Sequence, residues 1–250
     1  MQKRILALLL SLFCIQVGLQ SSSIVDDFHF LKDNDIFVQF VDAVKNEGNT
    51  ERAEQLSLAL LNTQEKPLVQ AVISLGTATM LARLYTELEP AQKDKAKKLL
   101  LQAEAELVNL EQHPFFSLIL SAEVDSIAYL LNPRSLGKGI SSNSKIKEAY
   151  QLYPQQAFAI LMKASSLLYA PRIAGGNREQ ALTLYLQLLK QKDIQLALWD
   201  IASVYSSIGI IAVKRKEWQT AASYLTSAKD LYAFDPTVDA YLTKVKEHLL

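Results

Sequence analysis

Residues 205–232, YSSIGIIAVKRKEWQTAASYLTSAKDLY, decide the fold of this chain. The spacings of four and three between Ala221, Leu225 and Ala228 place these residues on one face of a helix. Tyr205, Ile208 and Gly209 stand at fixed distances upstream, in a segment that also has helical spacing. Small residues let two helices approach to about 8–10 Å, while large residues fill the gaps between them. The stretch therefore predicts two closely packed helices.

The same small-large spacing recurs earlier in the chain. The first alanines of the four copies are separated, in chain order, by 43, 85 and 40 residues. The middle separation is therefore about twice each of the other two. The doubled interval predicts a diverged helix pair in the middle of the chain. A single pair leaves an apolar face exposed, so several pairs must stack. The three further copies are Ala53, Ser57 and Leu60; Ala96, Leu100 and Ala103; and Ala181, Tyr185 and Leu188.

Residues 202–235 resemble the tetratricopeptide repeat, a two-helix unit of about 34 residues. The first helix of that unit carries large-large-Gly, and the second carries Ala, an aromatic residue and Ala. Ala212 stands where the family has a large residue, and Pro236 falls a few residues later than the family's usual Pro. The resemblance covers roughly residues 35–235. It implies an α-solenoid of antiparallel helix hairpins that binds partners, and it carries over no catalytic residue.

A second region resembles a bacterial subgroup of the same family. The matching segments are LLNPRSLGKGISSNSKIKEAYQLYP, residues 130–154, and LLYAPRIAGGNREQALTLYLQLLK, residues 167–190. In that subgroup a Pro-x-x-x-Gly-Gly insert joins the two helices of one repeat, and Pro171, Gly175 and Gly176 match it. The best repeats are therefore expected at about 156–190 and 202–235.

Hydrophobic spacings of three and four run almost throughout the chain, and only 8 Gly and 7 Pro interrupt them. This pattern predicts an all-α protein of about eleven helices in a single repeat domain over residues 23–250. Residues 132–145, NPRSLGKGISSNSK, are expected to form the longest irregular segment. The helices are expected near 36–44, 53–61, 68–85, 91–110, 115–131, 146–153, 155–170, 177–190, 194–215, 217–232 and 237–250.

The first 22 residues have the layout of a secretory signal. Lys3 and Arg4 precede an almost wholly apolar run from Ile5 to Ile15, which is too short to span a bilayer comfortably. Cys14, the only cysteine, stands where a bacterial lipoprotein signal carries its lipidated Cys, but Phe13 replaces the small residue that precedes it in such signals. The sequence thus predicts export to the periplasm or cell envelope and leaves open whether Cys14 is lipidated or removed.

The segment Pro171–Asn177 has two interpretations. Gly175 and Gly176 before a helix could bind an anion through backbone N–H groups, with Arg172 and Arg178 nearby. Alternatively, Pro171 ends one helix, the glycines turn the chain, and Asn177 caps the next helix. No strand precedes the glycines, so the contexts of the Rossmann and Walker motifs are missing. The helix junction is the preferred interpretation.

Other polar groups indicate no catalytic or metal chemistry. GKGIS at 137–141 lacks the upstream glycine of a phosphate loop and is expected to be a surface loop. His29, His113 and His248 are far apart in sequence, so no zinc site is expected. Glu123 and Asp125 point to different faces of one helix and are expected to anchor contacts between repeats. With 26 basic and 26 acidic residues, the chain is not expected to bind nucleic acid. No cofactor is predicted.

The concave face of the expected solenoid is the predicted partner-binding site. The leading hypothesis is a non-enzymatic scaffold that binds another protein or an extended peptide, with the membrane reached only through a lipid anchor. The alternative is a transporter-associated component that binds a small molecule in an inter-helix cavity or pairs with a solute-binding protein. A large apolar cavity lined by residues 68–85 and 115–131 would favour this alternative. Oligomeric state stays open. The candidate partner-binding residues are Lys163, Ser166, Tyr169, Ser203, Ser206, Ile210 and Lys214.

Overall fold

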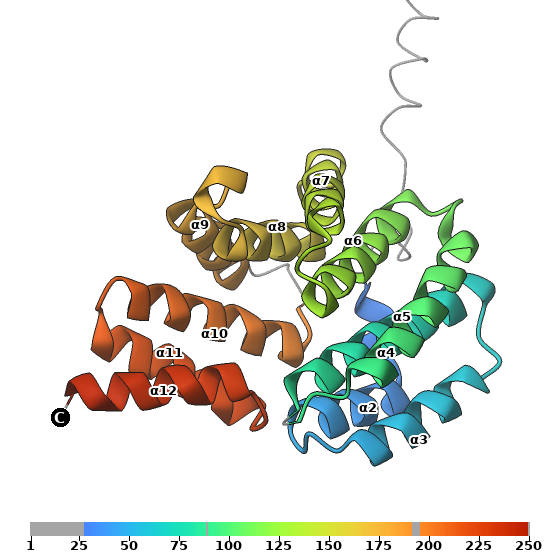
Figure 1. The fold of residues 1–250 in the computed structure, drawn as a ribbon, viewed down its shortest axis with the longest axis horizontal. Coiled ribbons are helices and arrows are strands. Elements are labelled where there is room, and N and C mark those ends of the chain that lie inside the picture. Colours follow the sequence, from blue (N-terminus) through green and yellow to red (C-terminus); the bar gives the residue numbers. More distant parts are fainter. Residues whose placement is uncertain (1–27, 89, 192–195, 250) are drawn as a thin grey trace, which may run out of the picture.

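The computed structural model describes residues 28–88, 90–191 and 196–249. Within these ranges the chain forms eleven α-helices and three short 3₁₀ helices and contains no strand, which confirms the all-α prediction (Figure 1). The predicted signal segment 1–22, with Cys14, lies outside the described residues.

Most of the helices begin or end at a proline or a capping side chain. Pro67 and Pro114 occupy first-turn positions, where the missing N–H costs nothing. Asn34, Asn49 and Asn177 each accept a hydrogen bond from a backbone N–H of the following first turn. The α-helices are α2 (Asp35–Lys45), α3 (Thr50–Leu61), α4 (Pro67–Glu87), α5 (Lys93–Glu106), α6 (Pro114–Leu131), α7 (Leu136–Leu152), α8 (Ala157–Tyr169), α9 (Arg178–Lys190), α10 (Leu198–Lys214), α11 (Trp218–Leu231) and α12 (Pro236–Leu249).

Each helix packs mainly on its neighbours in sequence. The most extensive contacts join α2 to α3, α4 to α5, α6 to α7, α8 to α9 and α10 to α11, and α12 then packs on α11. Two core clusters lie wholly or mostly within α2–α7, and two more lie within α8–α12. We call these two parts the N-terminal lobe, α2–α7, and the C-terminal lobe, α8–α12. They occupy opposite sides of Figure 1.

The close approach predicted for residues 205–232 is present between α10 and α11. A Cβ added to Gly209 would lie 2.6 Å from Leu225 Cγ, so only glycine fits at this contact without a shift of the neighbouring helix. Tyr205 is half-buried, and its ring centroid is 5.9 Å from that of Tyr224. The other predicted repeat positions are buried: Ala181, Tyr185, Ile208, Ala221, Leu225 and Ala228.

The prediction of an irregular segment at 132–145 is wrong. α7 starts at Leu136, so the expected loop GKGIS forms its first turns. Ser142, Ile146 and Ala149 are the buried residues of α7, and they repeat the spacings of four and three seen in the other copies. The diverged pair expected in the middle of the chain is therefore the α6–α7 pair, with a serine in place of the first alanine.

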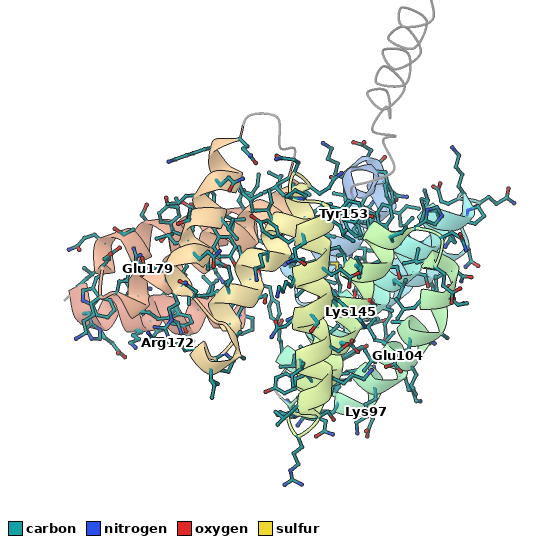
Figure 2. All side chains as sticks on the ribbon, turned by 90° about the horizontal axis from the view of Figure 1, so that it is seen from above. Lys97, Glu104, Lys145, Tyr153, Arg172 and Glu179 are labelled. Carbon is teal, nitrogen blue, oxygen red and sulfur yellow. The ribbon has the colours of Figure 1, made fainter. Side chains whose placement is uncertain are left out.

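Asp125 on α6 explains why this weakly helical sequence folds as α7. Its carboxylate accepts hydrogen bonds from Lys138 Nζ at 2.9 Å, Ser141 Oγ at 2.7 Å and Lys145 Nζ at 2.6 Å. These three donors lie on successive turns of one face of α7, and Lys138 also reaches Glu104 on α5 at 3.2 Å. Figure 2 labels Lys145 and Glu104 on these two helices. Because Asp125 is only 4% exposed, it needs these partners. Asp125 was expected to anchor contacts between repeats, and it instead anchors the two helices of one pair, α6 and α7, because all three of its donors lie on α7.

The junction interpretation of Pro171–Asn177 is confirmed. α8 ends before Pro171, Gly175 adopts φ +89°, and Asn177 Oδ1 accepts the N–H of Gln180 at 3.1 Å. A Cβ at Gly176 would collide with the carbonyl oxygen of Ala170. The backbone N–H groups of Gly176 and Asn177 donate to the carbonyls of Pro171 and Leu167. Since chain carbonyls already accept these N–H groups, they do not form an anion cradle.

Candidate partner-binding surface

The loop between the last two helices contacts the turn between the first two. Phe234 N donates to Lys45 O at 2.7 Å, and Ala233 N donates to Asn46 Oδ1 at 2.7 Å. The Phe234 ring lies so close to Gly48 that a Cβ there would be 2.6 Å from it. We call this contact between the α2–α3 turn and the α11–α12 loop the seam. It lies at the lower edge of Figure 1 and joins the two lobes on the side away from α7.

Between the lobes, solvent-accessible polar groups from several helices interact with one another. Arg83 on α4 pairs with Glu123 on α6 at 3.3 Å, and their side chains are 43% and 25% exposed. Arg83 also interacts electrostatically with Glu87 and with Tyr169 on α8. Asp235, in the α11–α12 loop, interacts with both Glu87 and Tyr169. These groups belong to both lobes and influence one another electrostatically, so they lie near one another. We call the region between the lobes that carries them the central hollow.

The pKa shifts of three of these groups follow from burial and from one another's charges. Burial, followed by the neighbouring Tyr185 hydroxyl, raises the pKa of Tyr169 to about 12. Burial also raises the pKa of Glu87, and Asp235 adds to this effect. For Arg83, burial alone would lower the pKa, but Glu123 and Glu87 outweigh it and raise the pKa.

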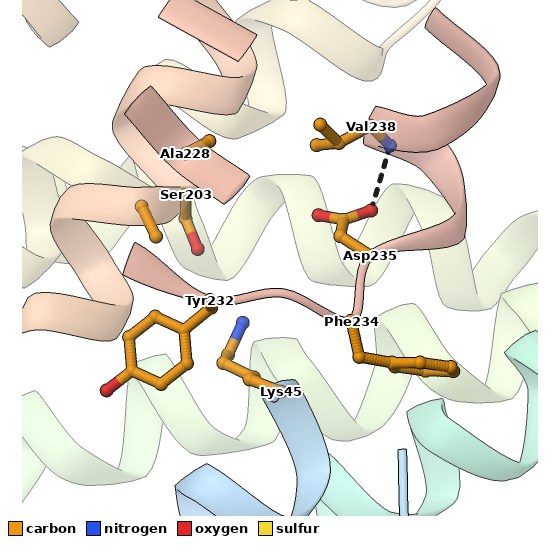
Figure 3. A pocket seen from close by; sticks show the side chains of 8 residues that line it. Lys45, Ser203, Ala228, Tyr232, Phe234, Asp235 and Val238 are labelled. Carbon is orange, nitrogen blue, oxygen red and sulfur yellow. Dashed lines mark hydrogen bonds between the residues drawn. The ribbon is translucent and has the colours of Figure 1, made fainter. Parts of the chain in front are cut away.

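The structure brings only part of the predicted partner-binding set together at the hollow. Tyr169 lies in it, and its hydroxyl interacts with Ser207 on α10. Ser203 lines a small pocket at the seam, where Lys45, Tyr232 and Asp235 converge (Figure 3). This pocket measures about 20 Å³, which is room for a water molecule rather than a ligand.

The remaining predicted residues lie elsewhere or are covered. Ile210 is 2% exposed and belongs to the core between α10, α11 and α12, so its prediction as a surface contact is wrong. Ser206 is 9% exposed, and its hydroxyl donates to the carbonyl of Ser203. Ile210 and Ser206 are covered because α10 is apolar on nearly all sides and packs against helices on more than one face.

Three residues of the predicted set face other neighbours. Ser166 donates to Asn143 on α7 at 2.8 Å, and the nearby Lys163 has a lowered pKa because of burial and the adjacent Lys147. Burial, together with Arg178 and Lys244, lowers the pKa of the exposed Lys214. The neighbouring cations Lys147, Arg178 and Lys244 therefore add to the effect of burial on these two lysines.

Sequence reasoning missed most of the charged groups of the hollow. Glu123 is the exception, because it was expected to anchor contacts between repeats, and its pair with Arg83 joins α6 to α4. Arg83 is likewise a charged residue within a long apolar helix, and this signal could have identified it. Glu87 and Asp235 sit next to helix ends, where charged residues are common, so nothing in the sequence separates them from ordinary surface groups.

The described part of the chain was searched for metal-ligating clusters and for helices that could span a membrane. No group of three or more metal-ligating side chains occurs there. α4 and α6 are long and apolar enough to cross a membrane, but 61% and 44% of their most apolar windows are buried inside the protein. The pocket beside Lys45 and a second one beside Leu186 are lined by neither helix, so they give no support to a ligand cavity between α4 and α6.

Comparison of the chain with protein-family models, curated proteins and solved structures finds no match.

Proposed function

We propose that this chain is a non-enzymatic helical-repeat protein of the tetratricopeptide type that binds a segment of another protein, or a peptide, in the central hollow. The pattern of contacts supports a solenoid of antiparallel hairpins. α2 contacts α4, α4 contacts α6, and α8 contacts α10, while α3, α5, α7, α9 and α11 each contact the first helix of the next pair. Such a stack places the first helix of each pair on the inner side.

The observation that carries the proposal is the set of solvent-accessible polar groups inside the hollow. Arg83, Glu123 and Tyr169 come from three different helices and keep part of their surface open to water. Within a concave wall, such groups can exchange water for the backbone and side-chain groups of a bound segment. Tyrosine and arginine are also the residue types that contribute most often to binding energy at protein interfaces.

A pull-down from envelope extract tests this proposal. The bait is the protein without its first 22 residues, as wild type, Arg83→Ala and Tyr169→Ala, with Lys97→Ala as the matched control. Lys97 is 60% exposed on α5 and pairs only with the nearby Asp94 among the ion pairs of the described residues. We expect one partner that wild type and Lys97→Ala retain and the two hollow variants lose by about tenfold, as a lost hot-spot contact predicts.

The proposal fails if wild type captures no partner, or if all variants that keep wild-type circular dichroism capture it equally. Native mass spectrometry of the same purified protein addresses the small-molecule alternative. A stoichiometric bound compound that is lost in Tyr169→Ala would replace the peptide proposal with that alternative.

We further propose that the chain is exported, on the basis of residues 1–22. Fractionation of cells that express the full chain should place the protein in the envelope. Labelling with a fatty acid, compared between wild type and Cys14→Ser, then decides between a lipid anchor and a cleaved signal. Retention of the full-length chain in the cytoplasm would contradict export.

A further inference from the structure

We propose that one face of α7, together with the side of α8 next to it, is a docking surface for a protein segment that carries an aliphatic side chain and a carboxylate. We call it the α7–α8 face. It has an apolar end at Leu136 and Ile140 and a cationic end at Lys147 and Lys163. These side chains are not those of the central hollow, so the proposal does not rest on the function proposed for the hollow.

Four residues form a row along α7. Leu136, Ile140, Asn143 and Lys147 follow one another at spacings of four, three and four, which places them on one side of the helix. α7 packs extensively on α6 and much less on α8, so this side is only partly covered. α7 lies at the upper edge of Figure 1, and Figure 2 views the molecule from above that edge.

The apolar end of the face is open to water. Leu136 is 62% exposed and Ile140 is 66% exposed, although both are aliphatic. Tyr129 of α6 extends this surface, because its ring would lie 3.4 Å from a Cβ placed on Gly139 and is itself partly exposed. Neighbouring apolar side chains that stay in water are typical of interaction surfaces.

The cationic end joins α7 to α8. Ser166 Oγ on α8 donates to Asn143 Oδ1 on α7 at 2.8 Å. Lys147 lies one turn beyond Asn143, and Lys163 lies one turn before Ser166. Burial, followed by the charge of Lys147, lowers the pKa of Lys163, so the two ammonium groups are close enough to repel each other. The amide of Asn143 adds N–H donors beside them.

These two lysines differ from the other lysines of α7. Lys138 and Lys145 face α6, and both pair with Asp125. Among the ion pairs of the described residues, none includes Lys147 or Lys163. An anion between two cations relieves their repulsion and forms charge-assisted hydrogen bonds with both. The free protein therefore has an uncompensated charge that a carboxylate of a partner neutralises.

The length of the face determines the spacing of the two groups in the partner. Ile140 and Lys147 are two helical turns apart, which corresponds to about 10 Å along the helix axis. An extended segment covers about 10 Å in three residues. An aliphatic residue three positions away from Asp or Glu therefore reaches both ends. The two ends follow one another along one helix, so a segment that lies along α7 fits them better than a flat membrane surface does.

Selection of random peptides displayed on phage tests the α7–α8 face. The bait is the full chain, and we expect it to enrich peptides that carry an aliphatic residue three positions from an acidic one. A synthetic copy of the enriched peptide should bind the double variant Lys147→Glu with Lys163→Glu at least about tenfold more weakly than wild type. Ile140→Ser should weaken binding by about threefold, because the exposed aliphatic contact is lost.

A matched control separates the site from net charge. Lys97→Glu with Lys98→Glu changes the charge by the same amount at exposed positions of α5 and should bind the peptide as wild type does. The proposal is overturned if no acidic peptide is enriched, or if the Lys147 and Lys163 double variant keeps wild-type circular dichroism and wild-type binding. Binding of wild type, but not of this double variant, to vesicles of phosphatidylcholine and phosphatidylglycerol, with no peptide enriched, would instead assign the face to anionic lipid.

Stability measurements test the cationic end without any ligand. Lys147→Gln and Lys163→Gln should each raise the urea midpoint, because each removes the repulsion, and the double variant should gain less than the sum of the two. Lys145→Gln, which loses the pair with Asp125, should lower the midpoint. Unchanged or lower midpoints in both Lys147→Gln and Lys163→Gln would contradict the proposal. Neither experiment needs a natural partner, so both succeed or fail independently of the pull-down.

Discussion

α7 and α11 occupy equivalent places, each packed on the helix before it, but they are held in different ways. α11 buries Ala221, Leu225 and Ala228 against α10, and Leu225 fills the space left by Gly209. α7 buries Ser142, Ile146 and Ala149 at the same spacings, but its alignment on α6 depends on the carboxylate of Asp125. Packing of small and large residues is thus sufficient for one pair, whereas the other pair adds a polar anchor.

The difference shows how much tertiary contacts can change local preference. The first half of α7 contains Gly137, Gly139, Ser141 and Ser144, all weak helix formers, whereas α11 is rich in Ala and Leu. An exposed surface loop would satisfy the preferences of residues 136–144. The helix is stabilised instead by three hydrogen bonds to the buried carboxylate of Asp125. A fourth hydrogen bond runs from Ser142 Oγ to the carbonyl of Ala122 at 2.8 Å.

The largest loss of stability is expected at Gly209, where α11 packs so closely on α10 that no side chain fits between them. Gly209→Val would force a branched side chain against Leu225 and should destabilise the protein by about 3 kcal/mol, the upper part of the range for an overpacked core. Urea unfolding measures the change. The double variant Gly209→Val with Leu225→Ala should recover part of the loss. If the single variant is as stable as wild type, α10 and α11 do not pack as closely in solution as the structure shows.

Removal of the polar anchor of α7 should have the next largest effect. Asp125→Ala leaves Lys138, Ser141 and Lys145 without their acceptor, and we expect a loss of about 2–3 kcal/mol, because hydrogen bonds to charged groups are the strong ones. Hydrogen exchange should show the loss of protection concentrated in α7. Asp94→Ala is the control, because the Asp94 side chain is 94% exposed, and it should change stability very little. Uniform loss of protection across α10 and α11 would contradict the local role of Asp125.

The same anchor predicts a pH dependence. Burial alone would raise the pKa of Asp125, but hydrogen bonds from Lys145, Ser141 and Lys138 outweigh it and hold the pKa below the ordinary 3.8. Because the pKa is lower in the folded state, the stability that Asp125 contributes is complete above its unfolded pKa and is lost as the pH falls through its folded pKa. Urea unfolding between pH 7 and 3 should therefore show a smaller acid loss in Asp125→Asn than in wild type. Identical slopes in both proteins would refute this prediction.

The smallest effect compares two glycines within helices. Nothing lies within 4 Å of a Cβ at Gly137 in α7, in contrast to Gly209 in α10. Gly137→Ala should therefore stabilise the protein by about 0.5–1 kcal/mol through helix propensity alone. A small rise in the urea midpoint is the expected result. Destabilisation would mean that residues 136–139 are not helical in solution.

The fold was more predictable from the sequence than the candidate site was. Helix limits at Pro67, Pro114 and Asn177 follow from local rules of proline and capping, and the junction at Gly175 follows from its need for positive φ. The prediction of the partner-binding surface was weaker because it assigned the exposed face of α10 from the resemblance to the tetratricopeptide repeat. Ile210 proved to be in the core. Glu123 was expected to anchor contacts between repeats, but its partner Arg83 was not predicted.

Periodicity and side-chain size act over one or two helices, so they were enough to predict a helical chain in which Ala221, Leu225, Gly209 and their earlier counterparts form helix contacts. The start of α7, the charged groups of the hollow and the seam between Phe234 and Gly48 became visible in the folded chain alone. Each of these depends on groups brought together from distant segments, such as Asp125 with Lys145, Arg83 with Glu123, and Asn46 with Ala233. Contacts of that kind leave no periodic signal, since their partners are selected by the geometry of the packed helices and not by spacing along the chain.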